Sequence, residues 1–123
     1  MANEITVNLQ VNVTNGNYTR RAAPGVVNVD QAAQGQGGGI ISIGTSEEAL
    51  SFTDITTKGW CFLRNLDDTN YVEYGPESAG AMVGFGRLEP GEPAAMRLIP
   101  GSLTIRMQAN TAACNVEVIV WED

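Results

Sequence analysis

Histidine is absent from this sequence of 123 residues, and cysteine occurs only twice. Without histidine the chain lacks the commonest general base and the commonest metal ligand. A Ser-His-Asp or Cys-His catalytic arrangement therefore cannot form within it, and two cysteines alone make a poor zinc site. Cys61 and Cys114 both lie in apolar stretches, where a free cysteine packs as a small hydrophobic side chain. We expect no enzyme, no disulfide, no metal and no other cofactor.

Basic residues are also scarce. Lysine and arginine number 7 against 14 aspartates and glutamates, which gives a formal net charge of −7. Nucleic acids and anionic membranes are bound through basic faces, and only Arg20 and Arg21 are adjacent cations. No apolar run approaches the roughly eighteen residues that a membrane helix needs, and the opening MANEITVNLQ has no secretory signal pattern. Nucleic acid and membrane are therefore not expected as partners.

Carboxylates occur in two adjacent pairs, Glu47-Glu48 and Asp67-Asp68. Hydrolysis of a glycosidic bond needs two acids that face each other across a cleft, whereas neighbours in a strand point to opposite faces. Both pairs also lie near expected turns, which favours solvated side chains. Oxygen ligands for calcium are available at Asp67, Asp68, Asn70 and Glu73, but aspartate and asparagine also simply suit a turn. The sequence therefore points to no catalytic and no metal-binding residue.

Aromatic residues make up only 7% of the chain. Trp60 and Phe62 share one face of an expected strand, and Tyr71 and Tyr74 follow closely. Such a group suits a stacking platform for a sugar, but the apolar neighbours of Trp60 and Phe62 favour packing in a core.

Alternating strands are what the sequence has in abundance. In EITVNLQVNVT, Ile5, Val7, Leu9, Val11 and Val13 point to one side, and only Thr, Asn and Gln point to the other. A period of two residues predicts a half-buried strand over residues 4–13, and Asn15-Gly16 predicts a tight turn after it. The polar side of this strand carries no charge, although soluble proteins usually guard an exposed edge with lysine or a bulge. Residues 1–14 are therefore a candidate strand for contacts between subunits.

Further strands are expected at spacings of about ten residues. A short strand is expected at Val26–Val29, a flexible loop over 31–39, and a strand or single helical turn at 46–52. The run GWCFLRNL, residues 59–66, is predicted to be a central strand buried on both faces. Additional strands are expected within residues 40–46, 71–75, 82–88, 94–100, 102–110 and 114–123. In the last of these, Cys114, Val116, Val118 and Val120 alternate and are expected to form a largely buried face. This pattern predicts one all-β domain over residues 1–123, an antiparallel β-sandwich like a jelly roll, with an immunoglobulin-like sandwich as the alternative.

The segment LEPGEPAAMRLIPG contains two Pro-Gly pairs. Proline presets φ at the second turn position, and glycine accepts a positive φ after it. Pro90-Gly91 and Pro100-Gly101 are therefore expected to be turns, with Pro93 at the start of an edge strand between them.

The segments TTKGWCFLRNLDDTNYVEYG, RLEPGEPAAMRLIPG and IRMQANTAACNVEVIVWED resemble small structural proteins of tailed bacteriophages. The resemblance spans residues 45–123, and its motifs are structural ones. It implies a virion component, namely a capsid decoration protein with a jelly roll or related β-fold, made in the host cytoplasm and placed on the capsid surface. It also implies two partners, the major capsid protein and copies of the chain itself, as a trimer or a dimer. No catalytic residue is carried over.

Three functions are thus open. A structural decoration protein comes first, a carbohydrate-binding β-sandwich module of a tail fibre or baseplate second, and an enzyme last. Stiff Pro-Gly turns lose little entropy when they are pressed against a partner. The candidate interface residues are Ile5, Val7, Leu9, Val11, Pro90, Gly91, Pro100 and Gly101.

Overall fold

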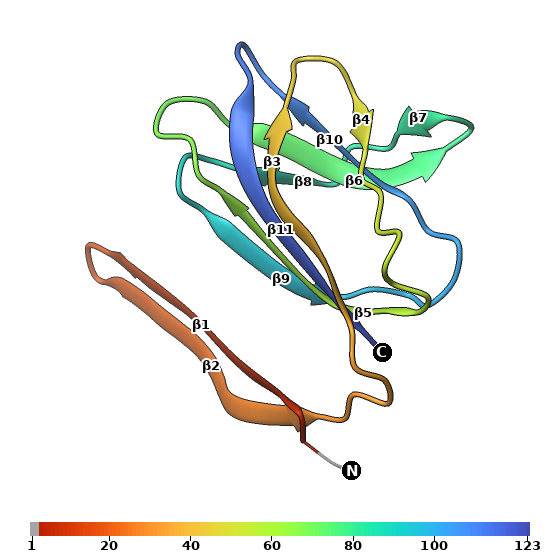
Figure 1. The fold of residues 1–123 in the computed structure, drawn as a ribbon. Coiled ribbons are helices and arrows are strands. Elements are labelled where there is room, and N and C mark those ends of the chain that lie inside the picture. Colours follow the sequence, from red (N-terminus) through yellow and green to blue (C-terminus); the bar gives the residue numbers. More distant parts are fainter. Residues whose placement is uncertain (1–2) are drawn as a thin grey trace. The chain divides into compact units, whose positions relative to one another are not determined.

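The computed structural model describes residues 3–123, and within that range the chain forms strands and no helix (Figure 1). No segment of this range is a helix long and apolar enough to span a membrane. The strands are β1 (Ile5–Asn15), β2 (Tyr18–Val29), β3 (Gln36–Ile43), β4 (Glu48–Ala49), β5 (Lys58–Asn65), β6 (Val72–Ser78), β7 (Ala81–Met82), β8 (Gly86–Leu88), β9 (Pro93–Arg97), β10 (Ile105–Ala109) and β11 (Cys114–Glu122).

The chain divides into two compact units, residues 1–33 and residues 34–123. The first unit is an antiparallel hairpin of β1 and β2, which we call the arm. Its two-residue turn at Gly16 and Asn17, with φ of 59° at Gly16, confirms the predicted turn. The expected sandwich is built from the second unit.

The second strand of the arm is longer than the sequence pattern indicated. The prediction placed a short strand at Val26–Val29, whereas β2 already begins at Tyr18. Pro24 obscured it, because proline cannot donate a hydrogen bond within a ladder. The structure accommodates Pro24 at a shift of register, where Leu9 pairs with Gly25 but Val11 pairs with Ala22.

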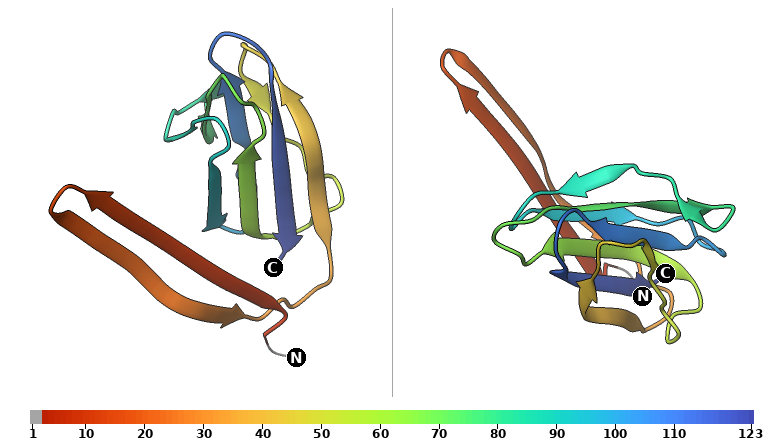
Figure 2. Two further views of the ribbon diagram at one scale, coloured as in Figure 1. Left: turned by 90° about the vertical axis from the view of Figure 1, so that its left-hand side faces the viewer. Right: turned by 90° about the horizontal axis from the view of Figure 1, so that it is seen from above.

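The second unit is a sandwich of two antiparallel sheets, which lie as two layers in Figure 2. One sheet has the order β3-β11-β5-β9, and the other has the order β4-β10-β6, with β7 and β8 both paired to β6. Most connections cross from one sheet to the other, as from β3 to β4, β4 to β5 and β10 to β11. This is jelly-roll topology. It confirms the predicted all-β antiparallel sandwich and selects the jelly roll over the immunoglobulin-like alternative.

The core lies between the two layers. Cys114, Val116, Val118 and Val120 alternate along β11 and are each 0% exposed, which confirms the inward face predicted for this strand. The other buried apolar residues are Ile43, Leu50, Ile55, Cys61, Leu63, Val72, Leu88, Leu98, Ile105, Met107 and Ala109.

The prediction for β5 was wrong about its second face. The strand is internal to its sheet, as expected, but only the face of Cys61 and Leu63 is buried in the core. Trp60 and Phe62 alternate with them and are only half-buried on the outer side of the sheet. An almost wholly apolar run suggested two buried faces, yet residues 34–123 supply a second layer on only one side of this sheet.

The predicted loop at residues 31–39 also needs correction, because β3 starts at Gln36 and pairs with β11 through its three glycines. Gly38 has a φ of 106°, and a Cβ atom there would lie 2.0 Å from the carbonyl oxygen of Val118. Glycine is therefore required by the close approach of two backbones, not by flexibility. The ambiguous segment at 46–52 contains the short strand β4.

Candidate functional site

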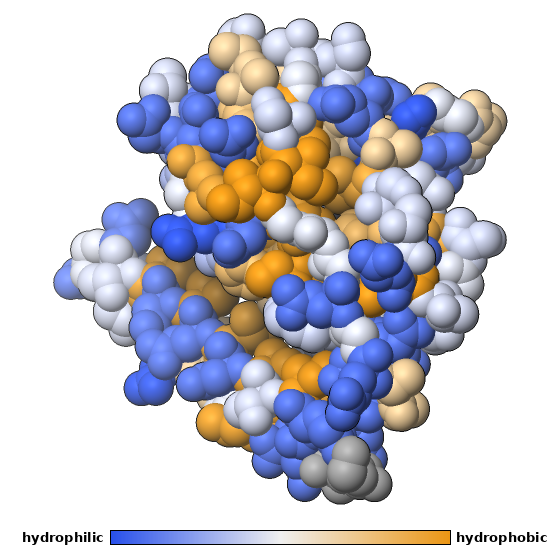
Figure 3. Space-filling model, in the orientation of Figure 1, coloured by the Kyte–Doolittle hydropathy of each residue, from blue (hydrophilic) through white to orange (hydrophobic). Residues whose placement is uncertain are grey.

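The arm carries an apolar face with no layer packed on it within its own unit. Ile5, Val7, Leu9, Val11 and Val13 alternate along β1 and so share one side of the hairpin. Leu9 is 46% exposed, Val11 63% and Val13 43%, and apolar residues are visible among polar ones on the hairpin in Figure 3. Burying one such side chain contributes roughly 1.5–3 kcal/mol, and the arm alone does not gain it. The cross-strand partners on this face are Val29, Val27, Gly25 and Ala22, and near the turn Arg20, which pairs with Val13.

The opposite face of the arm is polar. Thr6 Oγ1 donates to Asn28 Oδ1 at 3.3 Å, and Arg21 Nη2 donates to Gln10 Oε1 at 3.3 Å. Arg20 and Arg21 both lie near the turn, and no acidic residue occurs between Ile5 and Val29. The arm therefore has one largely apolar face and one polar face, and its positive charge lies toward its tip.

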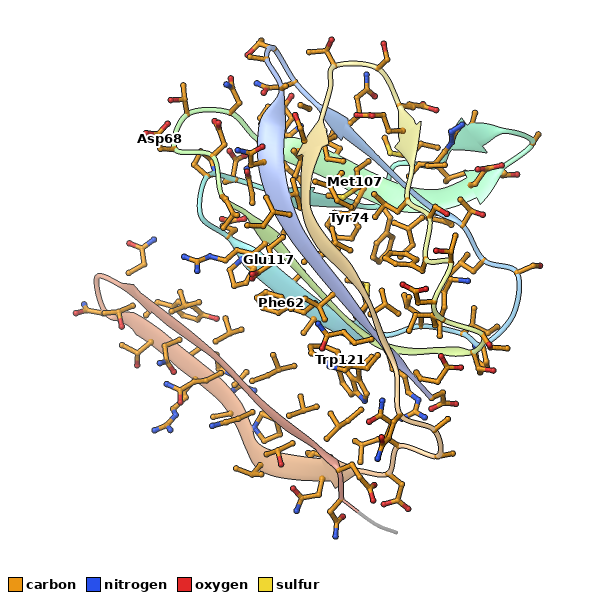
Figure 4. All side chains as sticks on the ribbon, in the orientation of Figure 1. Phe62, Asp68, Tyr74, Met107, Glu117 and Trp121 are labelled. Carbon is orange, nitrogen blue, oxygen red and sulfur yellow. The ribbon has the colours of Figure 1, made fainter. Side chains whose placement is uncertain are left out.

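A second apolar surface lies on the outer side of the sheet β3-β11-β5-β9. It consists of Trp60, Phe62, Ala95, Ile119 and Trp121, all half-buried, and we call it the aromatic face. Ile119, Phe62 and Ala95 are direct cross-strand partners in one row over three strands. Figure 4 shows Phe62 and Trp121 on the side of the β5–β11 pair away from the other sheet.

The rim of the aromatic face is polar. Arg97 forms an ion pair with Asp123, and Arg64 Nε donates to the carbonyl oxygen of Gly91 at 3.4 Å. Within the face itself, the indole N–H of Trp60 is shielded from water and finds no acceptor among residues 3–123. An unsatisfied buried donor costs roughly 1–3 kcal/mol.

One end of the sandwich is acidic, and a buried asparagine organises it. Asn65 is 0% exposed, and its Nδ2 donates to the carbonyl oxygens of Asn70 at 2.8 Å and Leu88 at 3.1 Å. Its backbone accepts from Gly91 N and donates to the carbonyl oxygen of Glu92, each at 3.1 Å. The two loops 66–70 and 89–92 therefore meet beside one residue. They bring the carboxylates of Asp67, Asp68, Glu89 and Glu92 to what we call the acidic end.

Asp67 makes the turn that the sequence predicted. Its Oδ2 accepts the backbone N–H groups of Asn70 at 2.6 Å and Thr69 at 3.0 Å. These hydrogen bonds, that of Asn70 first, lower the pKa of the Asp67 carboxyl. The carboxylate is thus used to stabilise the loop.

The other carboxylates and the cysteines considered in the sequence analysis also have structural surroundings. Glu47 Oε2 accepts the backbone N–H of Met82 at 2.9 Å, and Glu48 Oε2 accepts that of Gly44 at 2.5 Å. No group of three or more His, Cys, Asp and Glu side chains in residues 3–123 is arranged to hold a metal ion. Cys61 and Cys114 are free and buried, and burial raises the pKa of the Cys61 thiol to about 12.

The structure brings together only part of the predicted interface. Ile5, Val7, Leu9 and Val11 share the apolar face of the arm. Pro90 and Gly91 lie in the exposed turn between β8 and β9, at the acidic end, and Gly91 has a φ of 80°. Pro100 and Gly101 lie in the connection after β9, where Lys58 Nζ donates to the Gly101 carbonyl oxygen at 3.4 Å. The two Pro-Gly turns therefore stand at opposite ends of β9.

Sequence reasoning found only part of the aromatic face. It placed Trp60 and Phe62 on one face of their strand but assigned that face to the core. It did not include Ile119 and Trp121, although Val118 and Val120 can point inward only if these two residues point outward.

No protein-family model matches the chain, and no curated protein matches it. Among solved structures, the chain has a similarity to a carbohydrate-binding module from Cellvibrio mixtus lichenase 5A in complex with cellotriose. The TM-score is 0.34 at 14% sequence identity, over 94% of this chain and 86% of that one. A similarity of this degree carries no argument about function.

Proposed function

We propose that this chain is a structural virion protein of a tailed phage, which decorates the capsid lattice and is held there by contacts between subunits. The observation that carries the proposal is the arm, a hairpin whose apolar face has no covering layer in its own unit. The resemblance of residues 45–123 to phage structural proteins supports the assignment to a virion. The site of action is the capsid surface, and the chain is made in the host cytoplasm.

The arm by itself has no second layer on its apolar face. An isolated two-stranded hairpin is at best marginally stable in water, and this one exposes Leu9, Val11 and Val13. Its outer edges also present unpaired backbone groups without a guarding charge on β1. A subunit that joins a lattice gains both the buried area and the edge pairing from its neighbours. The partners we propose are the major capsid protein and further copies of the chain.

Catalysis is not part of the proposal. The carboxylates of Glu47, Glu48 and Asp67 accept backbone N–H groups, and histidine is missing. These three carboxylates therefore contribute to holding loops in place.

The proposal is tested by binding to heads assembled from the cognate major capsid protein. The double variant Leu9→Asn/Val11→Asn removes two apolar side chains of the arm without touching the sandwich core. We expect at least a tenfold loss of bound copies, since each lost apolar contact is worth more than about 1 kcal/mol. The matched control Asn8→Thr, on the polar face, should bind as the parent does. Full occupancy by the double variant, or no binding by the parent, would overturn the proposal.

A second candidate function is carbohydrate binding, and the aromatic face favours it. Three aromatic side chains, Trp60, Phe62 and Trp121, lie half-buried on one sheet surface, and amphipathic rings suit stacking against a ligand. Titration of the intrinsic tryptophan fluorescence with oligosaccharides tests this reading. A saturable change that is lost in Trp121→Ala would establish it, and its absence over a broad glycan panel would remove it.

A further inference from the structure

We infer that the arm of one copy packs on the aromatic face of a second copy, with the arm tip toward the acidic end. This inference rests on the proposed function, because it names how copies of the chain hold one another in the lattice. The two surfaces are the arm face of Ile5, Val7, Leu9, Val11 and Val13, and the face of Trp60, Phe62, Ala95, Ile119 and Trp121.

The two surfaces complete each other as layers. A sheet with one apolar side needs a second layer against it, and each of these surfaces lacks one within its own unit. The arm offers aliphatic side chains in two adjacent strands, and the aromatic face offers rings and Ile119 in the two adjacent strands β5 and β11. Packed face to face at about 10 Å, as sheets pack in sandwiches, they would add a third layer to the jelly roll.

The strand lengths indicate that the tip of the arm extends past the sheet that the arm covers. At about 3.3 Å per residue, a strand of 11 residues such as β1 spans about 36 Å, whereas the 9 residues of β11 span about 30 Å. The arm is thus longer than the longest strand beneath it. The residues nearest the turn, Asn15 and Tyr18, would reach beyond the end of the aromatic face, and Arg20 and Arg21 lie two and three residue pairs behind them.

The charges on the two surfaces set the orientation of the arm and favour a second copy of the chain as its partner. Between Ile5 and Val29 the arm carries two arginines and no acid. In the first unit Glu4 and Asp30 offset these arginines, so the whole net charge of −7 resides in residues 34–123. The acidic end gathers Asp67, Asp68, Glu89 and Glu92, where Arg87 forms an ion pair with Glu89 and Arg64 donates to the carbonyl oxygen of Gly91. A tip with two arginines is therefore attracted to that end of the sandwich of another copy.

The size of the buried surface favours an assembly in which each copy both gives an arm and receives one. An arm face about 36 Å long and about 10 Å wide covers roughly 350 Å², below the roughly 800 Å² per partner of a stable interface. A copy that both gives an arm and receives one buries about twice as much, close to that size. We therefore infer a closed dimer or trimer in which every arm is received.

The inference is tested by mixing two tagged variants of the full chain, Val11→Cys and Ala95→Cys, with a short bifunctional maleimide reagent. Neither variant carries both cysteines, so a cross-linked pair of unlike tags requires the arm of one copy on the face of another. The native Cys61 and Cys114 are each 0% exposed, and the parent chain measures their background. We expect the unlike pair to exceed the control mixture of Asn12→Cys with Ala95→Cys at least fivefold, because Asn12 lies on the opposite side of the arm.

A charge exchange tests the orientation. Arg20→Glu/Arg21→Glu should weaken self-association at least tenfold at low salt, measured by sedimentation equilibrium. Adding Asp68→Lys/Glu89→Lys to the same chain should restore most of it. Failure of the added substitutions to restore association would overturn the placement of the tip.

Two results would overturn the inference as a whole. One is a chain that stays monomeric at all concentrations, because the arm then packs on no second copy. The other is an oligomer in which the unlike pair cross-links no better than the control. The capsid-binding assay is separate, so loss of binding in Leu9→Asn/Val11→Asn without any exchange between copies would leave the proposed function intact.

Discussion

Glu122, near the end of β11, accepts the backbone N–H of Thr57 at 2.7 Å through a side chain in a residue only 8% exposed. The same carboxylate accepts from Thr56 N at 3.1 Å and 3.2 Å, one distance to each oxygen. The backbone N–H of Glu122 in turn donates to the carbonyl oxygen of Gly35 at 3.0 Å. One residue therefore fastens the loop before β5 and the segment before β3 to the last strand.

The first prediction is that Glu122→Gln lowers the free energy of unfolding by about 1–3 kcal/mol. Hydrogen bonds to a charged acceptor are worth about this much, and the amide replaces one acceptor oxygen with a donor that faces other donors. Denaturant unfolding followed by tryptophan fluorescence measures the change. Glu117→Gln on the outer side of β11 is the matched control and should stay within about 0.5 kcal/mol of the parent. Equal effects for the two variants would contradict the role given to Glu122.

The second prediction separates the two faces of β11. Val118→Asp places a charge where the parent residue is 0% exposed, with a cost of several kcal/mol. That is a large part of a typical stability of about 5–15 kcal/mol, so we expect a largely unfolded chain. Ile119→Ser, one position along and on the aromatic face, should stay folded and instead lose self-association. Circular dichroism and sedimentation together measure both outcomes, and a folded Val118→Asp would show that the assigned register is wrong.

The third prediction concerns acid stability at Asp67. Its pKa is lowered in the folded chain by the N–H groups of Asn70 and Thr69. A lowered pKa gives a stabilisation that is present above the unfolded-state value, about 3.9, and is lost as pH falls through the folded-state value. The parent should therefore be more stable than Asp67→Asn at neutral pH, and the difference should shrink below about pH 4. Thermal unfolding of both proteins between neutral and acidic pH measures it, and a difference independent of pH would contradict the hydrogen bonds assigned to the carboxylate.

The fourth prediction concerns the thiols. Burial raises the pKa of Cys61 to about 12, and burial is also the main reason that the pKa of Cys114 is raised. Because the thiolate is the reactive form, neither cysteine should react with a thiol reagent at neutral pH until the chain is unfolded. A raised pKa also means that stability declines as pH climbs above about 8.5, the value of an exposed thiol. Rapid labelling of the native protein would contradict the burial of both residues.

Much of the fold could be predicted from the sequence, because apolar residues at every second position of a strand indicate that one of its faces is apolar and suited to packing against another layer. The inward face of β11 was predicted for this reason. The strand β1 was predicted from the same alternation, although no layer covers it within its own unit, and the turn at Asp67 was predicted from its residue types. The second half of β3 was predicted within residues 40–46, but its first half was not, because Gly37–Gly39 carry no side chains to alternate. Their place in the sheet depends on the backbone of Val118, more than seventy positions away in the sequence.

The candidate site was predictable only in part. The apolar side of β1 is visible in the sequence as a period of two residues, and no contact with other elements is needed to infer it. The aromatic face is different, because Phe62 and Ile119 become neighbours only through strand pairing. The gathering of four carboxylates around Asn65 likewise depends on two loops, 66–70 and 89–92, that no local pattern connects.

The position of β11 between β3 and β5 determines when, during synthesis of the chain, the aromatic face can form. The arm is a local hairpin at the start of the chain, and hairpins close within about 1–10 μs. It can therefore form while the ribosome is still adding residues, at about 5–20 per second. The aromatic face is complete only when the last strand has entered the middle of its sheet, because Ile119 and Trp121 belong to that strand. The residues of the arm are therefore synthesised seconds before the same chain can form the face that receives an arm.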